Sequence, residues 1–313
     1  MKILTPVKNL LFWIELINAW TDEIYFWVVS NSWEKKHWYK SILNRRDGSL
    51  ANINSYEDAK KLIDYARIKW VKSYITLNNS PNIVDIELIN KEIENAILIK
   101  PDALIVKDIF IADIIRKFDK NIEIHCSSLN QVLNSEHIKF WIEKYNISRM
   151  IFPRNISTKE IITLCNKFPN LEFEIFIKND WCYNSDWVCS SLHFEWLKTG
   201  IPFVCHREPK YKTNDKDFQE KYLDLYTKMF DCKVCMLAEL KDLKNLVSLK
   251  IVWREKPLPI MLNDLKFIQN SLKFLKLAEN NKEYINFNIK LHKKFVKKQC
   301  NYKWCEYYRK NIN

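Results

Sequence analysis

Glycine is nearly absent from this sequence, which has only Gly48 and Gly200 among its 313 residues. Phosphate-binding loops of the G-x-G-x-x-G and Walker types need several glycines at fixed spacing, because the backbone must approach the phosphate closely. Nucleotide-binding folds that depend on such loops are therefore excluded. Asparagine is abundant, and we expect it to occupy many turns, since it tolerates positive φ better than most residues with a Cβ.

Long apolar runs are absent as well. No stretch approaches the roughly 20 apolar residues of a transmembrane helix. Residues 10–14 are apolar, but Glu15 interrupts them and no small-residue cleavage site follows, so no secretory signal is evident. These absences predict a cytoplasmic protein, in which cysteines serve as thiols or metal ligands rather than disulfides.

Hydrophobic residues make up 47% of the chain and aromatic residues 14%, with twelve tryptophans, which is ample for a large core. The length fits one large α/β barrel or two smaller domains. The net charge of +12 indicates either a lysine-rich solvated surface or an anionic partner such as RNA. The one dense basic run is 290–298, in a helix-like segment near the end.

Short apolar runs and segments of helical periodicity alternate about eight times. This alternation predicts a parallel sheet with helices outside it, and eight units favour a (β/α)8 TIM-barrel-like fold. A doubly wound open sheet is the alternative. We expect the barrel domain to span 1–280 and a short C-terminal helical extension to span 281–313. The predicted strands are 2–4, 23–29, 71–77, 103–106, 122–125, 149–152, 171–177 and 247–252. The predicted helices include 86–98, 109–118, 129–144, 158–167, 218–229, 238–246 and 262–277, and Asn9 and Ser55 are expected to cap two earlier helices.

In such a barrel the functional groups lie at the carboxyl ends of the strands. Polar residues at or near predicted strand ends are Asn78, His125, Arg154 and Arg254. An arginine at the mouth suits a bidentate pair with a carboxylate ligand, although a structural ion pair is an equally simple interpretation. Glu174, inside a predicted strand, must be paired or protonated, and Arg154 or Arg254 is the expected partner.

Five of the nine cysteines fall within one stretch past the middle of the chain. Four have the spacing Cys182-x6-Cys189-x15-Cys205-x29-Cys235 and follow the predicted strand 171–177. Four thiolates suit an iron–sulfur cluster. Cys232-x2-Cys235 is also a common zinc-binding pair, and ordinary buried cysteines remain a third interpretation. We predict neither a second metal site nor a partner for Cys300 and Cys305, near the end of the sequence.

Several segments of the sequence resemble peptidase family U32, the collagenase-like proteins. The resemblance includes FEIFIKNDWC, where a glutamate-containing strand leads into the first cysteine, and IEIHCSSLNQVLNSEHIKFWIEKYNISRMIFPRNIS, with a His-Ser-rich turn and a later arginine. It also includes VCMLAELKDLKNLVSLKIVWREKP, which contains the last cysteine and the Lys250-Ile251…Arg254 element. Together the similar segments extend over about residues 1–275.

The resemblance implies an iron–sulfur protein. Several members of the family hold a [4Fe–4S] cluster, and some take part in oxygen-independent hydroxylation of ubiquinone or of an RNA pyrimidine, with prephenate as the suggested oxygen donor. The implied ligands are Cys182, Cys189, Cys205 and Cys235, with Cys232 as a spare. Zinc is the alternative metal. Peptidase activity and a non-catalytic role beside a paralogous U32 protein or another enzyme are the alternative functions.

The sequence also departs from the pattern of the family. The family usually has glycine where Asn179 and Trp253 stand. Lys178 replaces a frequent histidine, Leu129 a frequent glutamine and Asn155 a common acidic residue. These differences predict that the pocket is smaller or more aromatic than in other members, while the cluster ligands are kept.

Overall fold

The computed structural model describes residues 1–30, 52–81, 83–179, 232–252, 256–296, 300 and 305. Its centre is a closed barrel of eight strands in the order β1-β2-β3-β4-β5-β6-β7-β8. All neighbouring strands are parallel, including the closing pair β1 and β8. The predicted (β/α)8 fold is therefore confirmed, and the open-sheet alternative is wrong. The strands are β1 Lys2–Pro6, β2 Glu23–Phe26, β3 Lys72–Leu77, β4 Ala103–Val106, β5 Glu123–Cys126, β6 Arg149–Ile151, β7 Glu172–Lys178 and β8 Leu246–Ile251.

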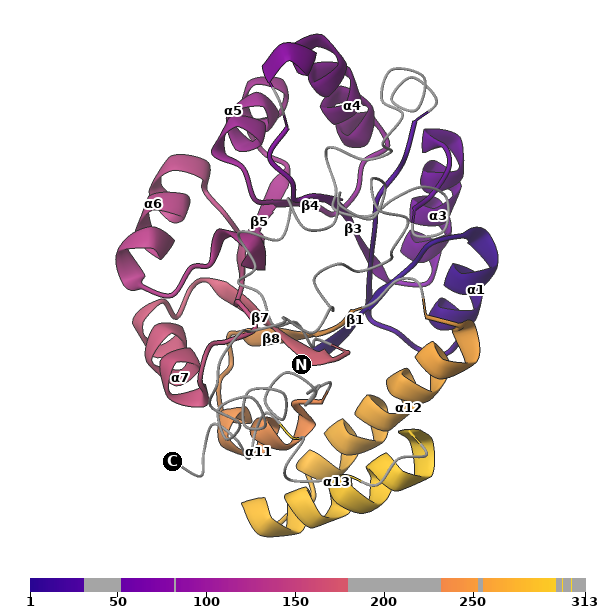
Figure 1. Cartoon of the computed structure of the whole chain (residues 1–313), viewed down its shortest axis with the longest axis vertical. Coiled ribbons are helices and arrows are strands. Elements are labelled where there is room, and N and C mark those ends of the chain that lie inside the picture. The colour runs from indigo at the N-terminus through magenta and orange to yellow at the C-terminus, as the bar shows by residue number, and fades with distance from the viewer. Residues whose placement is uncertain are drawn as a thin grey trace, which may run out of the picture.

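Helices surround the barrel and connect successive strands (Figure 1). Between the first seven strands, the described α-helices are α1 Leu10–Asn18, α3 Tyr56–Ile68, α4 Ile86–Leu98, α5 Ile109–Phe118, α6 Ser135–Tyr145 and α7 Thr158–Lys167. The short 3-10 helix η5, Val234–Met236, and α11, Leu237–Leu240, precede β8. After it come α12 Leu258–Leu275 and α13 Asn281–Val296.

Side-chain caps explain where several helices begin. Asn9 accepts a hydrogen bond from the backbone N–H of Phe12 at 3.0 Å, and Ser55 accepts one from Asp58 at 3.0 Å. Ser157 and Glu160 form a full capping box at the start of α7. These caps satisfy N–H groups that have no partner inside the helix, so helix starts marked by Ser or Asn were predictable.

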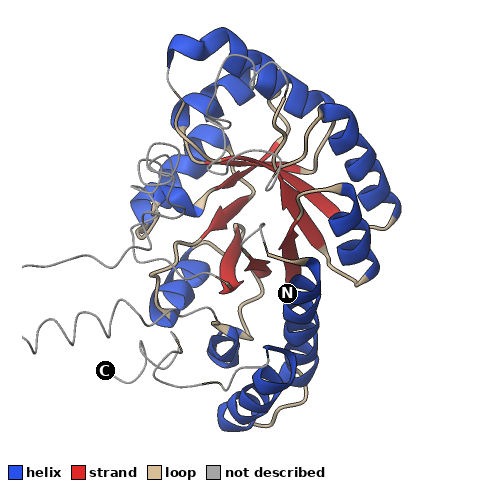
Figure 2. Ribbon diagram, turned by 45° about the vertical axis from the view of Figure 1, so that its right-hand side comes forward, coloured by secondary structure: helices blue, strands red, loops and turns tan. Residues whose placement is uncertain are grey.

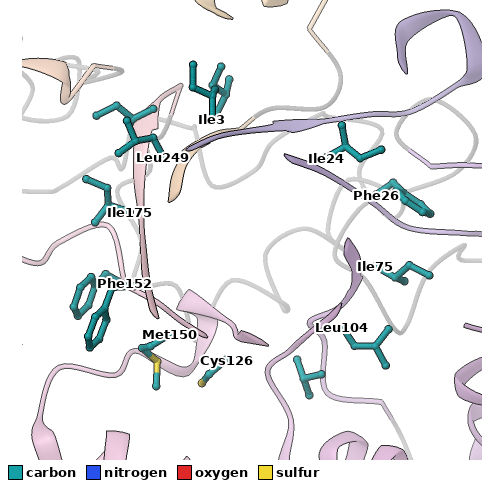
Figure 3. Close-up of a cluster of buried hydrophobic side chains, with 14 of the residues drawn as sticks. Ile3, Ile24, Phe26, Ile75, Leu104, Cys126, Met150, Phe152, Ile175 and Leu249 are labelled. Atoms are coloured by element: carbon teal, nitrogen blue, oxygen red, sulfur yellow. The ribbon is translucent and has the colours of Figure 1, made fainter. Parts of the chain in front are cut away.

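The core lies mainly between the barrel and its helices. Alternate strand residues point outward, among them Ile24, Ile75, Leu104 and Ile175, and they pack beneath the helices (Figure 3). A smaller apolar cluster lies inside the barrel and includes Leu4, Tyr25, Tyr74, Ile105 and Phe176. The interior is thus a packed layer rather than a pore, as in other barrels of this type.

The C-terminal helices α12 and α13 pack against each other beside the barrel (Figure 2). Tyr284 of α13 shares a 2.6 Å hydrogen bond with Ser271 of α12, and α13 also contacts η5 and α11. The division at residue 280 remains a prediction. Within the described residues, no helix is long and apolar enough to cross a membrane.

Some predicted helices have different limits in the structure. The helix expected over 129–144 begins only at Ser135, because Ser128–Asn130 forms a separate 3-10 turn and Asn134 is the N-cap. The helix expected over 238–246 is reduced to α11 because β8 already starts at Leu246. The helix expected over 262–277 begins at Leu258, directly after Pro257. The helix predicted over 218–229 lies outside the described residues.

Candidate functional site

The carboxyl ends of the eight parallel strands form one mouth of the barrel. Asn78 follows β3, Arg154 lies three residues beyond β6, and Asn179 follows β7. The segment Cys232 to Cys235 reaches the same mouth, because Cys232 forms an antiparallel bridge with Lys178 and the N–H of Lys233 donates to Ile177 O at 2.9 Å. Of the predicted site residues, Asn78 and Arg154 therefore lie at the carboxyl end of the barrel, and Cys235 belongs to a segment that starts there.

Below this mouth, the barrel interior holds a buried ion network. Arg149 on β6 binds Glu23 on β2 through two contacts of 3.0 Å, and its Nη1 lies 3.2 Å from Glu174 on β7. Lys250 on β8 binds the other carboxylate oxygen of Glu174 at 3.0 Å. Glu23 and Glu174 are fully buried, so their negative charges are compensated by Arg149 and Lys250 rather than by water.

Hydroxyl groups complete the network around Glu23. Tyr74 donates to Oε1 at 2.8 Å, and Ser248 donates to Oε2 at 2.6 Å. Burial alone would raise the pKa of Glu23, but the charge and hydrogen bonds of Arg149 lower it from 4.5 to about 2. Burial and the nearby Glu23 raise the pKa of Tyr74 far above its ordinary value. Glu23 is therefore ionised and Tyr74 protonated throughout the physiological pH range.

Glu174 was expected to pair with Arg154 or Arg254. Its cationic partners are instead Arg149 and Lys250, which flank it on the two neighbouring strands. The ring of Phe176 lies under the Arg154 guanidinium at 5.1 Å, and Arg154 O accepts a hydrogen bond from Lys233 at 2.8 Å. Arg254 lies outside the described residues. Arg154 is thus held at the mouth above Phe176, and its role in binding a ligand stays a prediction.

His125 was expected to end its strand, but β5 continues to Cys126 and the imidazole lies inside the barrel. It packs edge-on against Tyr74 at 4.7 Å, and Nε2 is 3.8 Å from Glu123. Nδ1 is buried and has no hydrogen-bond partner within the described part of the chain. Burial lowers the pKa of His125, so the ring is neutral near pH 7.

Two asparagines at the mouth carry buried polar atoms. Oδ1 of Asn78 and Oδ1 of Asn79 are buried, and neither has a hydrogen-bond partner among the residues that the structure describes. A buried acceptor without a partner costs free energy unless a ligand or water satisfies it. Asn78, which was predicted as a substrate-binding residue, therefore has an acceptor available for a donor group on a ligand.

Comparison with known protein families identifies the family of this chain. The profile of peptidase family U32 matches residues 16–309 of this chain. The chain belongs to peptidase family U32. The resemblance seen in the sequence is thereby confirmed over most of its length.

Three curated relatives of this U32 chain are informative. It is 32% identical over 131 residues to the tRNA hydroxylation protein P of Haemophilus influenzae, covering 42% of this chain and 28% of that protein. The tRNA hydroxylation protein P of Helicobacter pylori is 26% identical over 183 residues, with coverages of 58% and 40%. The collagenase of Porphyromonas gingivalis is 25% identical over 163 residues, with coverages of 52% and 35%. Each match spans less than half of the relative's own length.

Of the four predicted cluster ligands of this U32 member, Cys235 is described, whereas Cys182, Cys189 and Cys205 lie outside the described residues. Cys235 is 5% exposed. Burial, together with the charges of Cys232, Cys305 and Cys300, raises the pKa of the Cys235 thiol well above its ordinary value. A soft metal would have to displace this proton, which is the usual behaviour of a thiol ligand.

Cys300 and Cys305 interact electrostatically with Cys235, so the end of the chain returns to the cysteine-bearing segment. Tyr284 of α13 also contacts this cysteine-bearing segment, since its hydroxyl lies 3.4 Å from Val234 O in η5. Within the described residues, no group of three or more His, Cys, Asp or Glu side chains is arranged to hold a metal ion. The thiols present nevertheless match the donor type that an iron–sulfur cluster requires.

Asn179 keeps the backbone conformation that glycine would supply in other U32 members. Its φ is 64°, in the left-handed region that asparagine tolerates better than most residues. Its side-chain amide donates to Asp264 at 2.8 Å, and its Oδ1 accepts from Lys256. The glycine-to-asparagine difference therefore preserves the turn after β7 and ties it to α12.

Arg149 and Glu23, the centre of the ion network, were not predicted from the sequence. A signal was present, because polar residues alternate with apolar ones in several strands that otherwise look buried. Such alternation places the polar residues on the inner face of a closed barrel. The inward polar positions on β2, β6, β7 and β8 are Glu23, Arg149, Glu172, Glu174, Ser248 and Lys250.

Proposed function

We propose that this U32 protein is an iron–sulfur protein that takes part in oxygen-independent hydroxylation of a tRNA, with a carboxylate-bearing donor such as prephenate. The observation that carries the proposal is the docking of the Cys232–Cys235 segment on the end of β7, at the mouth that also holds Asn78 and Arg154. Relatives named tRNA hydroxylation protein P support the substrate class.

The residues that would hold a [4Fe–4S] cluster are Cys182, Cys189, Cys205 and Cys235, with Cys232 as the alternative fourth ligand. A bound cluster supplies one-electron chemistry or an open iron position. The buried surroundings of Cys235 would protect such a cluster from water, because solvent exposure strongly affects cluster stability and potential.

Other residues of the chain would bind and orient the donor. The Arg154 guanidinium can form a bidentate pair with a carboxylate, and Arg254 is the second candidate for the same role. The Asn78 Oδ1 can accept a hydrogen bond from a hydroxyl of the donor or of the base. Glu174 and His125 lie deeper in the barrel, so their contribution would be to fix the charge and shape of the floor below the ligand.

The charge of the chain suits an RNA substrate. A net charge of +12 attracts a polyanion and makes binding depend strongly on salt. The alternative is a solvated lysine-rich surface without a nucleic-acid partner. Measured tRNA affinity at increasing salt separates the two, because phosphate contacts give a steep decline with ionic strength.

The decisive experiment combines metal analysis with tRNA analysis. We expect protein purified without air to be brown and to contain about four iron and four sulfide per chain, as a [4Fe–4S] cluster requires. The variants Cys232→Ala and Cys235→Ala identify the fourth ligand, because only the ligand variant should lose most of its iron. Cys165→Ala is the matched control, since Cys165 is a buried cysteine of α7 that is not among the predicted ligands.

Activity is read in the same preparations. A strain that lacks its own tRNA hydroxylation should regain hydroxylated tRNA nucleosides, seen by mass spectrometry, when it expresses the wild-type chain but not the ligand variant. Colourless protein with stoichiometric zinc would refute the cluster. A brown protein that never restores hydroxylation would instead favour a non-catalytic role beside a paralogous U32 protein or another enzyme, and co-purification would identify that partner.

The relative named collagenase keeps peptidase activity as a second candidate. That activity needs a nucleophile or a metal-bound water. Cleavage of denatured collagen that survives both chelation and Cys235→Ala would support the peptidase. Absence of cleavage, with hydroxylation restored in cells, would leave only the first candidate.

A further inference from the structure

Two tryptophans occupy backbone positions that favour glycine. Trp20 has a φ of 67° and Trp70 a φ of 60°, both in the left-handed region. Bulky residues rarely adopt this region, since their Cβ approaches the backbone carbonyl. The two residues stand at equivalent places, directly after the C-caps of α1 and α3.

Hydrogen bonds define the turn at both places. Trp20 N–H donates to Ile17 O at 3.0 Å, and the next N–H, of Thr21, donates to Leu16 O at 3.2 Å. Trp70 N–H donates to Arg67 O at 3.1 Å, and Val71 N–H donates to Ala66 O at 2.9 Å. This pair of bonds is the Schellman motif, in which the left-handed residue is usually glycine.

Neither indole compensates for the backbone cost by packing. Trp20 is 83% exposed and Trp70 is 93% exposed, although tryptophan is usually largely buried. Trp141 is the contrast within the same chain. It lies inside α6, is fully buried and packs against Tyr145 with ring centroids 4.9 Å apart.

Composition points in the same direction. Glycine averages about 7% of residues in proteins, whereas this chain has two glycines and twelve tryptophans in 313 residues. The deficit of glycine and the excess of tryptophan have one common explanation in the genetic code. The codon UGA is a stop in the standard code, and different lineages reassign it to tryptophan or to glycine.

We propose that positions 20 and 70 are glycine in the protein that its own cell makes, because their UGA codons are decoded there as glycine and not as tryptophan. The same decoding extends to Trp253, where U32 proteins usually have glycine. Trp253 directly precedes Arg254, the candidate carboxylate-binding residue.

The test is peptide mass spectrometry of the protein purified from its own cells, together with the codons of its gene. We expect UGA codons and glycine masses at positions 20 and 70, and a tryptophan mass at position 141. A tryptophan mass or a UGG codon at either position 20 or 70 overturns the proposal. A glycine mass at position 141 would also overturn it, because exposed, left-handed positions would then not differ from a buried position inside a helix.

Recombinant variants give an independent measurement. We expect Trp20→Gly and Trp70→Gly each to raise the melting temperature of the chain, since glycine adopts the left-handed turn without strain. Trp141→Gly should lower it, because a buried ring is lost from α6. A lowered melting temperature in both Trp20→Gly and Trp70→Gly would contradict the proposal.

Discussion

Arg149 and Glu23 form a bidentate ion pair across the inside of the barrel, with two N–O distances of 3.0 Å between residues 126 positions apart in the chain. The pair joins β6 to β2, and both side chains are almost completely buried. Arg149 also binds Glu172 at 2.7 Å and Glu174 at 3.2 Å, so one guanidinium connects three carboxylates. The network therefore fixes the floor beneath the candidate site.

Removing the arginine should be strongly destabilising. We expect Arg149→Met to lower the free energy of unfolding by about 3–5 kcal/mol, because buried carboxylates lose their counter-charge. Lys61→Met is the matched control, since the Lys61–Asp58 pair is exposed and worth at most about 1 kcal/mol. Urea denaturation measures both, and equal small losses would contradict a structural role for the network.

Acid should weaken the same network. The folded-state pKa of Glu23 is about 2 against an ordinary 4.5, so its stabilisation is present above pH 4.5 and is lost as the pH falls towards 2. The lowered pKa corresponds to a contribution on the order of 3 kcal/mol. Unfolding free energies measured across this range should fall less steeply in Glu23→Gln than in the wild type. An equal dependence of the unfolding free energy on pH in the two proteins would show that Glu23 does not cause the loss of stability in acid.

The left-handed turn after β7 can be tested with a pair of substitutions. Asn179→Gly and Asn179→Ala both lose the hydrogen bond to Asp264, but only alanine is strained at a φ of 64°. We expect the alanine variant to be less stable than the glycine variant by about 1–2 kcal/mol. At Lys91, an exposed position inside α4, the order should reverse, because glycine is the poorer helix former there. The same order at both positions would refute this explanation.

The hydroxyl of Tyr284 should hold the segment that contains Cys235 in place. Its hydroxyl contacts Ser271 at 2.6 Å and Val234 O at 3.4 Å, next to Cys235. We expect Tyr284→Phe to weaken this anchor by about 1 kcal/mol and to raise the rate at which a thiol reagent modifies Cys235 by roughly 5-fold.

The control for this experiment is Tyr145→Phe. Tyr145 donates to Ile109 O and Asp113 on another part of the barrel, so its loss should leave the labelling of Cys235 unchanged. Labelling can be followed at Cys235 by mass spectrometry of the peptide. An equal increase in both variants would indicate general destabilisation rather than a local anchor.

Much of the fold could be predicted because its signals are local. The helices at Ile86–Leu98, Ile109–Phe118 and Thr158–Lys167 and the strand at Ala103–Val106 have the predicted limits. Caps and apolar periodicity act over a few residues, so they are readable without the tertiary structure. The helix α6 started later than predicted because Gln131, with a φ of 50°, ends a separate 3-10 turn before it.

The candidate site was less predictable because it depends on contacts between distant strands. Asn78 and Arg154 lie at the mouth as expected, but His125 lies deeper and Glu174 pairs with Arg149 and Lys250. Which acid meets which base depends on the stagger of the barrel strands, which no short segment specifies. The alternation of polar residues in β7 and β8 indicated an inward ionic face, but not its pairing.

The sequence by itself determined the alternation of eight strands with helices, the caps that start the helices, and membership of the U32 family. These follow from periodicities and motifs carried by neighbouring residues. Only the tertiary structure decided that Arg149 would be shared by Glu23, Glu172 and Glu174, and that Cys232 would pair with the end of β7. Closure of the barrel places side chains from distant strands in one desolvated volume, where each charge must find its partner.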